Sequence, residues 1–411
     1  MAVINTAAAH QFYNRGPSKK NSVCVFWLKG RCNRNPCRYL HVESPTVKIN
    51  RPTTTRPTQD FNDPKKTHTQ IRVCDDWISD SCVYGDKCRF LHSWIHSDDD
   101  NNYQNLSMLT RLNGHKKDVM GIGLPSGSNK LYSGAKDGTV RVWDCESGEC
   151  VKIINHRAEI GCLISEGSWV FLGLPNAVKA LKIDAATGDY ETFVLKGPVG
   201  QVNSMAVCNI NDVLFAGSED GVISVWKGSV EANPFKLVAS IKAHSGSVLS
   251  LAVGTQKKKL FSSCADGTIR VWDLENLQCV QTLTGHKDAV KSLFLWDEYL
   301  FSCSLDKTIK IWFANQDGNF EVTYTHEEQY GVVSLFGMLD AERKPMLLTS
   351  CKDSGIRVYE LPSFKQRLRM FSRREVETID MGPHGLFFLG DRTGVISVWK
   401  WLPDQKMESD K

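Results

Sequence analysis

Residues 131–144 read LYSGAKDGTVRVWD, and close copies of this stretch return at 260–273 (LFSSCADGTIRVWD) and 300–312 (LFSCSLDKTIKIW). In each copy, β-branched residues alternate with polar or charged ones up to a tryptophan, which is the pattern of a half-buried β-strand. In the first two copies an Asp-Gly pair precedes the strand and marks a tight turn. The repeated stretch therefore predicts a series of hairpins and an all-β fold.

The repeat has a period of roughly 40 residues or slightly more and starts at residue 107. One position holds an aromatic residue in almost every copy, and these residues are Trp143, Trp226, Trp272, Trp312, Tyr359 and Trp399. The interval from Trp143 to Trp226 is about twice the period. Its midpoint holds a degenerate copy, Ala177 to Asp184, with Lys182 at the tryptophan position. We therefore expect seven units.

These units resemble WD40 repeats, each of which folds as a four-stranded blade of a β-propeller. The resemblance implies a seven-bladed propeller over residues 107–402. It also implies a hydrogen-bonded network of His, Ser, Asp and Trp inside a blade. The matching residues of the first, fourth and fifth blades are His115, Ser133, Asp137 and Trp143; His244, Ser262, Asp266 and Trp272; and His286, Ser302, Asp306 and Trp312.

The last unit has only three of its four expected strands, whereas Ser107 to Leu112 precedes the first unit as an unpaired strand-like piece. We expect residues 107–112 to form the outer strand of the final blade, because this would remove an exposed sheet edge.

A Ser, His and Asp set also occurs in hydrolases. Here the set recurs three times at one spacing and always with a tryptophan, whereas a catalytic nucleophile is needed once. The chain also has no Gly-x-Ser-x-Gly elbow, phosphate-binding loop or kinase signature. We therefore expect a protein that is not an enzyme, with no catalytic residues.

Two cysteine clusters near the N-terminus each close with a histidine after three residues. Their spacings are Cys-x7-Cys-x4-Cys-x3-His and Cys-x7-Cys-x5-Cys-x3-His, formed by Cys24, Cys32, Cys37 and His41, and by Cys74, Cys82, Cys88 and His92. Three thiolates and one imidazole fill a tetrahedral zinc shell, so each ion should be structural. Disulfides are the alternative, but the remaining cysteines lack such spacing. We expect two Zn²⁺ ions, with His92 favoured over His96 as the last ligand of the second site.

Both clusters resemble CCCH zinc fingers, whose members typically bind single-stranded RNA. Aromatic faces stack on unpaired bases and cations contact phosphates. The candidate contacts are Trp27, Lys29, Arg31, Arg34, Arg38 and Tyr39 in the first finger, and Trp77, Lys87, Arg89 and Phe90 in the second. Alternatively, the aromatic residues are the small core of each finger. The second finger carries four aspartates, so we expect the first to bind more strongly.

Charge and composition outline the remaining organisation. Net charge is +4, but residues 1–106 contain 15 Lys and Arg against 10 Asp and Glu, which concentrates the positive charge around the fingers. The expected segments are a disordered N-terminus (1–20), first finger (21–43), flexible basic linker (44–70), second finger (71–95), acidic linker (96–106), propeller (107–402) and tail (403–411). We see no secretory signal or membrane-spanning run, and expect the nucleus or cytoplasm, with the nucleus slightly favoured.

The combination of two CCCH fingers and a WD40 propeller resembles a plant family of zinc-finger WD proteins. The resemblance implies a non-enzymatic adaptor whose fingers bind single-stranded RNA and whose propeller recruits a protein partner, without a membrane or small-molecule substrate. Two alternatives are a DNA-binding transcriptional regulator and a protein-only scaffold such as a ubiquitin-ligase substrate receptor. The basic stretch from Lys365 to Arg374 is either a second phosphate-binding track or a solvated face of outer strands.

Overall fold

The computed structural model describes residues 20–23, 39–40, 73–79, 81–97, 106–228, 234–254, 258–340 and 342–402. The chain divides into two compact units, and the boundary between them falls after Ser93. The smaller unit contains the paired strands β1 (Lys20–Val23) and β2 (Tyr39–Leu40), the short helix α2 (Asp75–Ile78) and the 3-10 helix η2 (Gly85–Lys87). None of the helices in the described part of the chain has the length and hydropathy that a bilayer crossing requires.

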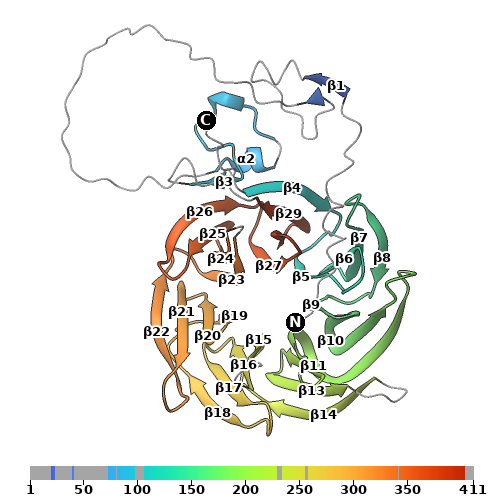
Figure 1. Ribbon diagram of the computed structural model, residues 1–411, viewed down its shortest axis with the longest axis vertical. Helices are drawn as coiled ribbons and strands as arrows, with labels where there is room; N and C mark the ends of the chain where they lie inside the picture. Colours follow the sequence, from blue (N-terminus) through green and yellow to red (C-terminus); the bar gives the residue numbers. More distant parts are fainter. Residues whose placement is uncertain are drawn as a thin grey trace, which may run out of the picture. The chain divides into compact units, whose positions relative to one another are not determined.

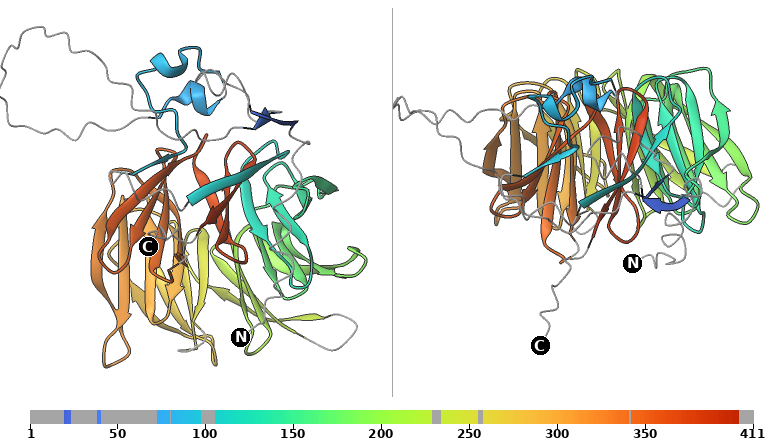
Figure 2. Two further views of the ribbon diagram at one scale, coloured as in Figure 1. Left: turned by 45° about the horizontal axis from the view of Figure 1, so that its top comes forward. Right: turned by 90° about the horizontal axis from the view of Figure 1, so that it is seen from above.

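The larger unit is a ring of antiparallel sheets arranged around a central axis (Figure 1). The view from the side shows strands that run between the two flat faces of the ring (Figure 2). Its strands are β3 (Ile95–His96), β4 (Leu106–Asn113), β5 (Val119–Gly123), β6 (Lys130–Ala135), β7 (Thr139–Asp144), β8 (Cys150–Asn155), β9 (Cys162–Glu166), β10 (Trp169–Ile183), β11 (Tyr190–Cys208), β12 (Val213–Ser218), β13 (Val222–Gly228), β14 (Phe235–Lys242), β15 (Val248–Gly254), β16 (Lys259–Cys264), β17 (Ile269–Asp273), β18 (Cys279–Leu283), β19 (Val290–Trp296), β20 (Tyr299–Ser304), β21 (Thr308–Ala314), β22 (Phe320–Glu327), β23 (Val332–Leu339), β24 (Pro345–Cys351), β25 (Gly355–Glu360), β26 (Lys365–Phe371), β27 (Val376–Met381), β28 (Leu386–Asp391) and β29 (Val395–Trp401).

The prediction of seven blades is wrong, because the described strands of the ring form six sheets. Three sheets consist of four strands in sequence order: β5 to β8, β15 to β18, and β19 to β22. Strands β23 to β26 carry β3 as a fifth strand, and β27 to β29 carry β4. The sixth sheet has six strands, β9 to β14, and occupies the place of the expected second and third blades.

This six-stranded sheet forms because one long strand serves both expected blades. The first part of β11 pairs with β10, and its last part, Val202 to Cys208, pairs with β12. In better-preserved copies, a His-containing corner separates an outer strand from the next inner one. The equivalent segment here, Lys196 to Gln201, lacks that histidine, although Gly197 (φ 149°) has nearly the backbone conformation of Gly285 (φ 151°) at a better-preserved corner. Gln201 pairs with Pro175 of β10, and the next residue, Val202, pairs with Ser218 of β12, so the two sets of strands join in one sheet.

Ring closure follows the prediction. Strand β4 pairs along its length with β29, from Asn113 opposite Val395 to Leu106 opposite Trp401. Leu112 is 2% exposed and belongs to a core cluster that also contains residues of β5, β6, β28 and β29. The N-terminal strand of the ring thus completes its last sheet, and the expected role of residues 107–112 is confirmed.

A fifth strand on the neighbouring sheet was not foreseen. Ile95 was expected in the second finger and His96 in an acidic linker, whereas both lie in β3, paired with β26. The backbone N–H of Phe371 donates to the carbonyl of Trp94, and the Arg111 guanidinium lies 4.8 Å from the centre of the Trp94 ring. This segment therefore belongs to the propeller unit.

The basic stretch on β26 is largely paired within the ring. Arg367 forms a 2.6 Å ion pair with Asp340, whose side chain is 1% exposed, and it also lies over the ring of Trp401. Arg369 pairs with Asp353 at 2.6 Å. Neither expectation for the stretch describes these two arginines, because their charges are already neutralised and they are not simply solvated.

Candidate metal centre and propeller networks

The second cysteine cluster is organised by two short helical turns. Cys74 is the N-cap residue of α2, and its Sγ accepts the backbone N–H of Trp77 at 3.4 Å. The turn η2 leads into Cys88. A bridge between Val73 and Leu91, with the Cys74 N–H donating to the Leu91 carbonyl, brings the start and end of the segment together. The first and last ligands of the spacing pattern are therefore brought close together in space.

The four predicted ligands come together at one point. One ligand atom from each of Cys74, Cys82, Cys88 and His92 lies within 4.8 Å of all the others. The sulfurs of Cys74 and Cys88 are 3.6 Å apart. Two thiolates that bind one zinc ion tetrahedrally at about 2.3 Å are separated by about 3.8 Å. The separation therefore suits a zinc ion.

The histidine supplies an independent observation. Nε2 of His92 is buried and has no hydrogen-bond partner among the described residues. A buried imidazole nitrogen without a partner is costly unless something binds it. Burial raises the pKa of the Cys74 thiol, whereas the backbone N–H of Tyr84 lowers the pKa of Cys82. The residues fit a structural zinc ion, which would hold all four side chains in their binding forms.

The aromatic residues of this finger have different surroundings. The Trp77 ring stacks on His92 with centroids 5.6 Å apart and an interplanar angle of 13°. Phe90 is half-buried, and the Arg89 guanidinium lies 5.0 Å from its ring centre. Tyr84, which was not among the predicted contacts, is 66% exposed. Trp77 therefore supports the metal ligand, and Tyr84 offers an open aromatic face. Lys87 is exposed beside this region.

The first finger stays a prediction. Its expected ligands and contacts lie outside the described residues, except that Tyr39 is described by its backbone alone; the others are Cys24, Cys32, Cys37, His41, Trp27, Lys29, Arg31, Arg34 and Arg38.

The network of the first blade has one consistent hydrogen-bonding pattern. Trp143 donates its indole N–H to the Ser133 hydroxyl at 2.8 Å, and that hydroxyl lies 2.8 Å from Nε2 of His115. Nδ1 of the same imidazole lies 3.2 Å from the Asp137 carboxylate. The hydroxyl can then donate to Nε2 while Nδ1–H donates to the carboxylate. Burial lowers the pKa of His115, which favours this neutral form.

The other two networks share this plan with one difference. In the sheet β19 to β22, Ser302 lies 2.8 Å from both the Trp312 indole and His286, and His286 lies 3.0 Å from Asp306. In the sheet β15 to β18, Trp272 and His244 likewise bond to Ser262. There Thr268 connects Nδ1 of His244 to Asp266. Thr139 and Thr308 make the same connection in the other two networks, where the imidazole also contacts the carboxylate directly. The threonines were not part of the predicted set.

These histidine, serine and aspartate side chains form an internal support of the blades. Ser133, Ser262 and Ser302 are all 0% exposed, and each accepts a hydrogen bond from a buried indole. A serine placed in this way has no access to a substrate.

Comparison with known proteins identifies the family. The chain is 44% identical over 417 aligned positions to zinc finger CCCH domain-containing protein 17 of Oryza sativa subsp. japonica, covering 94% of this chain and 93% of that protein. It is 45% identical to zinc finger CCCH domain-containing protein 48 of Arabidopsis thaliana, with the same coverages. This chain belongs to the plant CCCH zinc-finger WD40 family. Models of smaller units agree, since a CCCH-type zinc finger matches residues 72–93 and a WD domain, G-beta repeat matches residues 106–144.

Two further similarities concern the fold of this family member. A model described as the IP5P C-F beta-propeller matches residues 171–305. The solved WD40 β-propeller domain of Doa1 aligns with a TM-score of 0.59 and 21% identity, covering 74% of this chain and 98% of that structure. Both support a propeller. Zinc-finger and WD40 families are generally non-enzymatic, which fits the structural role of the networks.

Proposed function

We propose that this protein is an adaptor of the nucleus or cytoplasm, in which two zinc-bound fingers hold single-stranded RNA and the propeller receives a protein partner. The observation that carries the proposal is the Cys3His cluster with the orphaned Nε2 of His92. Zinc binding at this cluster orders a small fold around an exposed aromatic ring. The first finger repeats the ligand pattern, so the proposal includes a second ion.

The base-contacting surface of the second finger centres on Tyr84 and Arg89. Tyr84 presents most of its surface to solvent, and Arg89 is also exposed. Stacking of one unpaired base on an aromatic ring contributes about 1–3 kcal/mol. Trp77 contributes indirectly, by packing on the ligand His92. In the first finger, the sequence supports Trp27 and Tyr39 as stacking residues and the four nearby cations as phosphate contacts.

The test is fluorescence anisotropy of the zinc-loaded full chain with labelled single-stranded RNA, single-stranded DNA and duplex DNA at two salt concentrations. Trp27→Ala and Tyr84→Ala are compared with Val83→Ala, because Val83 is an exposed neighbour without an aromatic ring. The proposal predicts that the chain prefers single-stranded RNA. It also predicts that Trp27→Ala and Tyr84→Ala each weaken RNA binding, whereas Val83→Ala does not. Stronger binding to duplex DNA favours the transcriptional regulator, and no binding to any nucleic acid favours the protein-only scaffold.

A further inference from the structure

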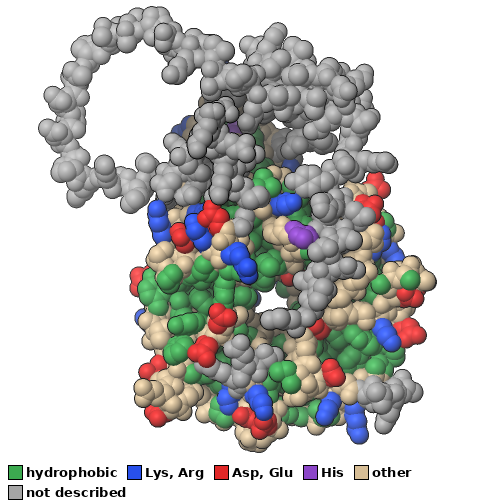
Figure 3. All heavy atoms as spheres, viewed as in Figure 1, with side chains coloured by type: hydrophobic (Ala, Val, Ile, Leu, Met, Phe, Trp, Pro, Cys, Tyr) green, Lys and Arg blue, Asp and Glu red, His purple; other side chains and the backbone are tan. Residues whose placement is uncertain are grey.

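A cavity of about 390 Å³ lies at the centre of the ring. The space-filling view shows its opening in the middle of one face (Figure 3). Residues from all six sheets line it, and its volume is within the range of sites that bind small ligands or single side chains.

The sequence builds this lining by a repeated local device. The pairing register shifts within a three-residue segment that consists of a valine, one further residue, and then Gly, Ser or Thr. This segment occurs in six strands, β5, β11, β15, β19, β23 and β27. Such a shift inserts an extra residue, as in a β-bulge, and re-aims its side chain. The inserted residues are Met120, Asn203, Leu249, Lys291, Val333 and Glu377, and all of them line the cavity. The identity of each inserted residue therefore determines the chemistry of the centre.

Most charges around the cavity neutralise one another. Arg392 forms an ion pair with Glu375 at 2.8 Å and lies 3.6 Å from Glu377. Lys136 pairs with Asp118 at 2.9 Å. The remaining lining carboxylate, Glu159, pairs with Lys117 at 3.0 Å. Arg392 is thus shared by Glu375 and Glu377 and also lies 3.4 Å from Asp118, so each lining acid has a cationic neighbour, although not always one of its own.

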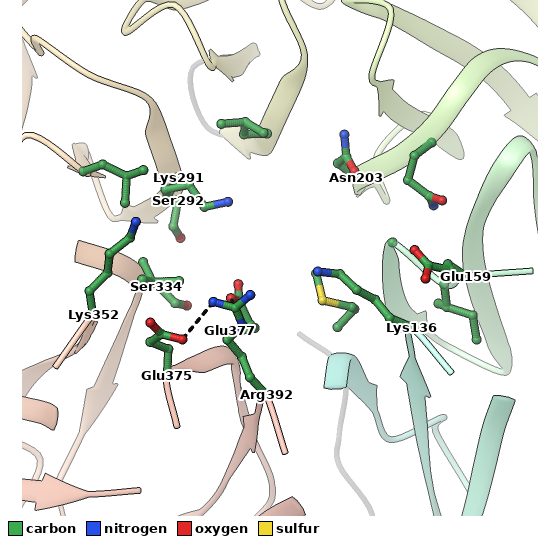
Figure 4. A pocket seen from close by; sticks show the side chains of 17 residues that line it. Lys136, Glu159, Asn203, Lys291, Ser292, Ser334, Lys352, Glu375, Glu377 and Arg392 are labelled. Carbon is green, nitrogen blue, oxygen red and sulfur yellow. Dashed lines mark hydrogen bonds and ion pairs between the residues drawn. The ribbon is translucent and has the colours of Figure 1, made fainter. Parts of the chain in front are cut away.

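Two lining cations remain. Lys291, the inserted residue of β19, and Lys352, which follows β24, have no ion pair or hydrogen bond from their ammonium groups among the described residues. The hydroxyls of Ser292 and Ser334 also line the cavity and make no side-chain hydrogen bond in the same part of the chain. Figure 4 shows these four side chains together on one side of the cavity, away from Glu159 and Lys136. This side thus offers two positive charges and two hydroxyl donors, with Glu375 and its ion-pair partner Arg392 beside Ser334.

We propose that this side of the cavity binds the carboxylate or phosphate of an acidic side chain in a peptide of the protein partner. Ammonium and hydroxyl donors converge there as an oxyanion requires. Leu249, Leu305 and Val333 line the cavity beside them and suit an apolar neighbour in the peptide. The proposal rests on the propeller half of the proposed function, whose partner class it specifies.

A peptide fits the lining better than RNA does. Among the described residues, no Phe, Tyr or Trp lines the cavity, so bases would find no stacking surface in this part of the chain. Three lining carboxylates, Glu159, Glu375 and Glu377, would also repel successive phosphates of a nucleic-acid backbone. One anionic side chain can reach the two lysines from the side of the cavity opposite Glu159.

The test uses the full chain and fluorescein-labelled peptides of the form Gly-Ser-Leu-Xaa-Leu-Ser-Gly, where Xaa is Asp, Glu, phosphoserine, Gln or Lys. The variants are Lys291→Gln, Lys352→Gln and their combination. Lys287→Gln is the matched control, because Lys287 is exposed near the same strand and does not line the cavity. Loss of one charge-assisted contact should weaken binding of an anionic peptide about tenfold.

We expect the unmodified chain to bind anionic peptides more tightly than the Gln peptide, with each cavity variant weakening the interaction and Lys287→Gln leaving it unchanged. Preference for phosphoserine or for Asp and Glu then identifies the source of the anion. The charge reversal Lys291→Glu with Lys352→Glu should favour the Lys peptide.

Equal affinity for anionic and neutral peptides, no binding up to millimolar peptide, or equal affinity of the cavity variants overturns the proposal. A further outcome is that oligouridine competes with the peptide for the cavity, with a binding that is lost in the Lys291 and Lys352 variants. That result would overturn the peptide proposal in favour of RNA. RNA binding through the fingers, measured in the same double variant, should be unchanged. A loss confined to peptide binding therefore separates failure of this site from failure of the proposed adaptor.

Discussion

Removal of the Ser302 hydroxyl should destabilise the propeller by about 2–6 kcal/mol. Ser302 is fully buried and lies 2.8 Å from both Nε1 of Trp312 and Nε2 of His286. In Ser302→Ala these two polar groups lose their shared partner, and each buried unsatisfied group costs about 1–3 kcal/mol. The loss is large because a folded domain is stable by only about 5–15 kcal/mol.

Urea unfolding of the full chain, followed by far-UV circular dichroism, measures this loss as a lower midpoint. Ser126→Ala is the control, because Ser126 is exposed in a turn, and it should change stability by less than about 0.5 kcal/mol. In a Trp312→Phe background the indole donor is already absent, so Ser302→Ala should cost about 1 kcal/mol less. A midpoint equal to that of Ser126→Ala, or strict additivity with Trp312→Phe, would refute the network as a source of stability.

Three further perturbations probe ring closure, protonation and metal binding. Leu112→Ala should lower the stability of the propeller by about 2–5 kcal/mol because it leaves a cavity between the last and first sheets, and an unchanged thermal transition would contradict closure by β4. Burial lowers the pKa of His244 to about 4, whereas an unfolded histidine titrates near pH 6.5, so its stabilising contribution is present above pH 6.5 and falls by roughly 2–3 kcal/mol as pH drops to about 4.5. A urea midpoint with the same pH dependence in His244→Asn as in the unchanged chain would argue against this origin. Cys88→Ser should remove one zinc ion per chain in a mass-spectrometric metal assay while the propeller spectrum is retained, and an unchanged metal content would exclude the second cluster as a site.

The repeated stretches predicted the architecture of the ring because they specify strands and turns locally. Ring closure was also predictable, since an unpaired strand before the first unit matched a missing strand in the last. The number of blades was not predictable, because the number of repeat copies does not show where two successive copies join into one sheet. Lys196 to Gln201 is the decisive segment, and only its lack of a corner histidine gave a signal.

The spacing of Cys74, Cys82, Cys88 and His92 was sufficient to place four side chains together, because metal coordination restricts spacing strongly. The solvent exposure of the aromatic residues could not be predicted from their spacing in the sequence. A ring near a ligand serves either as a cover for the metal or as a stacking surface, and the distinction between Trp77 and Tyr84 depends on three-dimensional packing. The lining of the central cavity did have a sequence signal, the recurring valine followed two residues later by Gly, Ser or Thr, which becomes meaningful once the register shifts are seen.

The central claim is that zinc organises the fingers as the RNA-binding part of this adaptor. Titration of a zinc chelator into the full chain bound to labelled single-stranded RNA, with anisotropy as the readout, tests it most directly. We predict that RNA is released as zinc is withdrawn and rebinds when two equivalents of zinc are returned, while the circular dichroism of the propeller stays constant. RNA binding that persists after complete removal of zinc would contradict the claim.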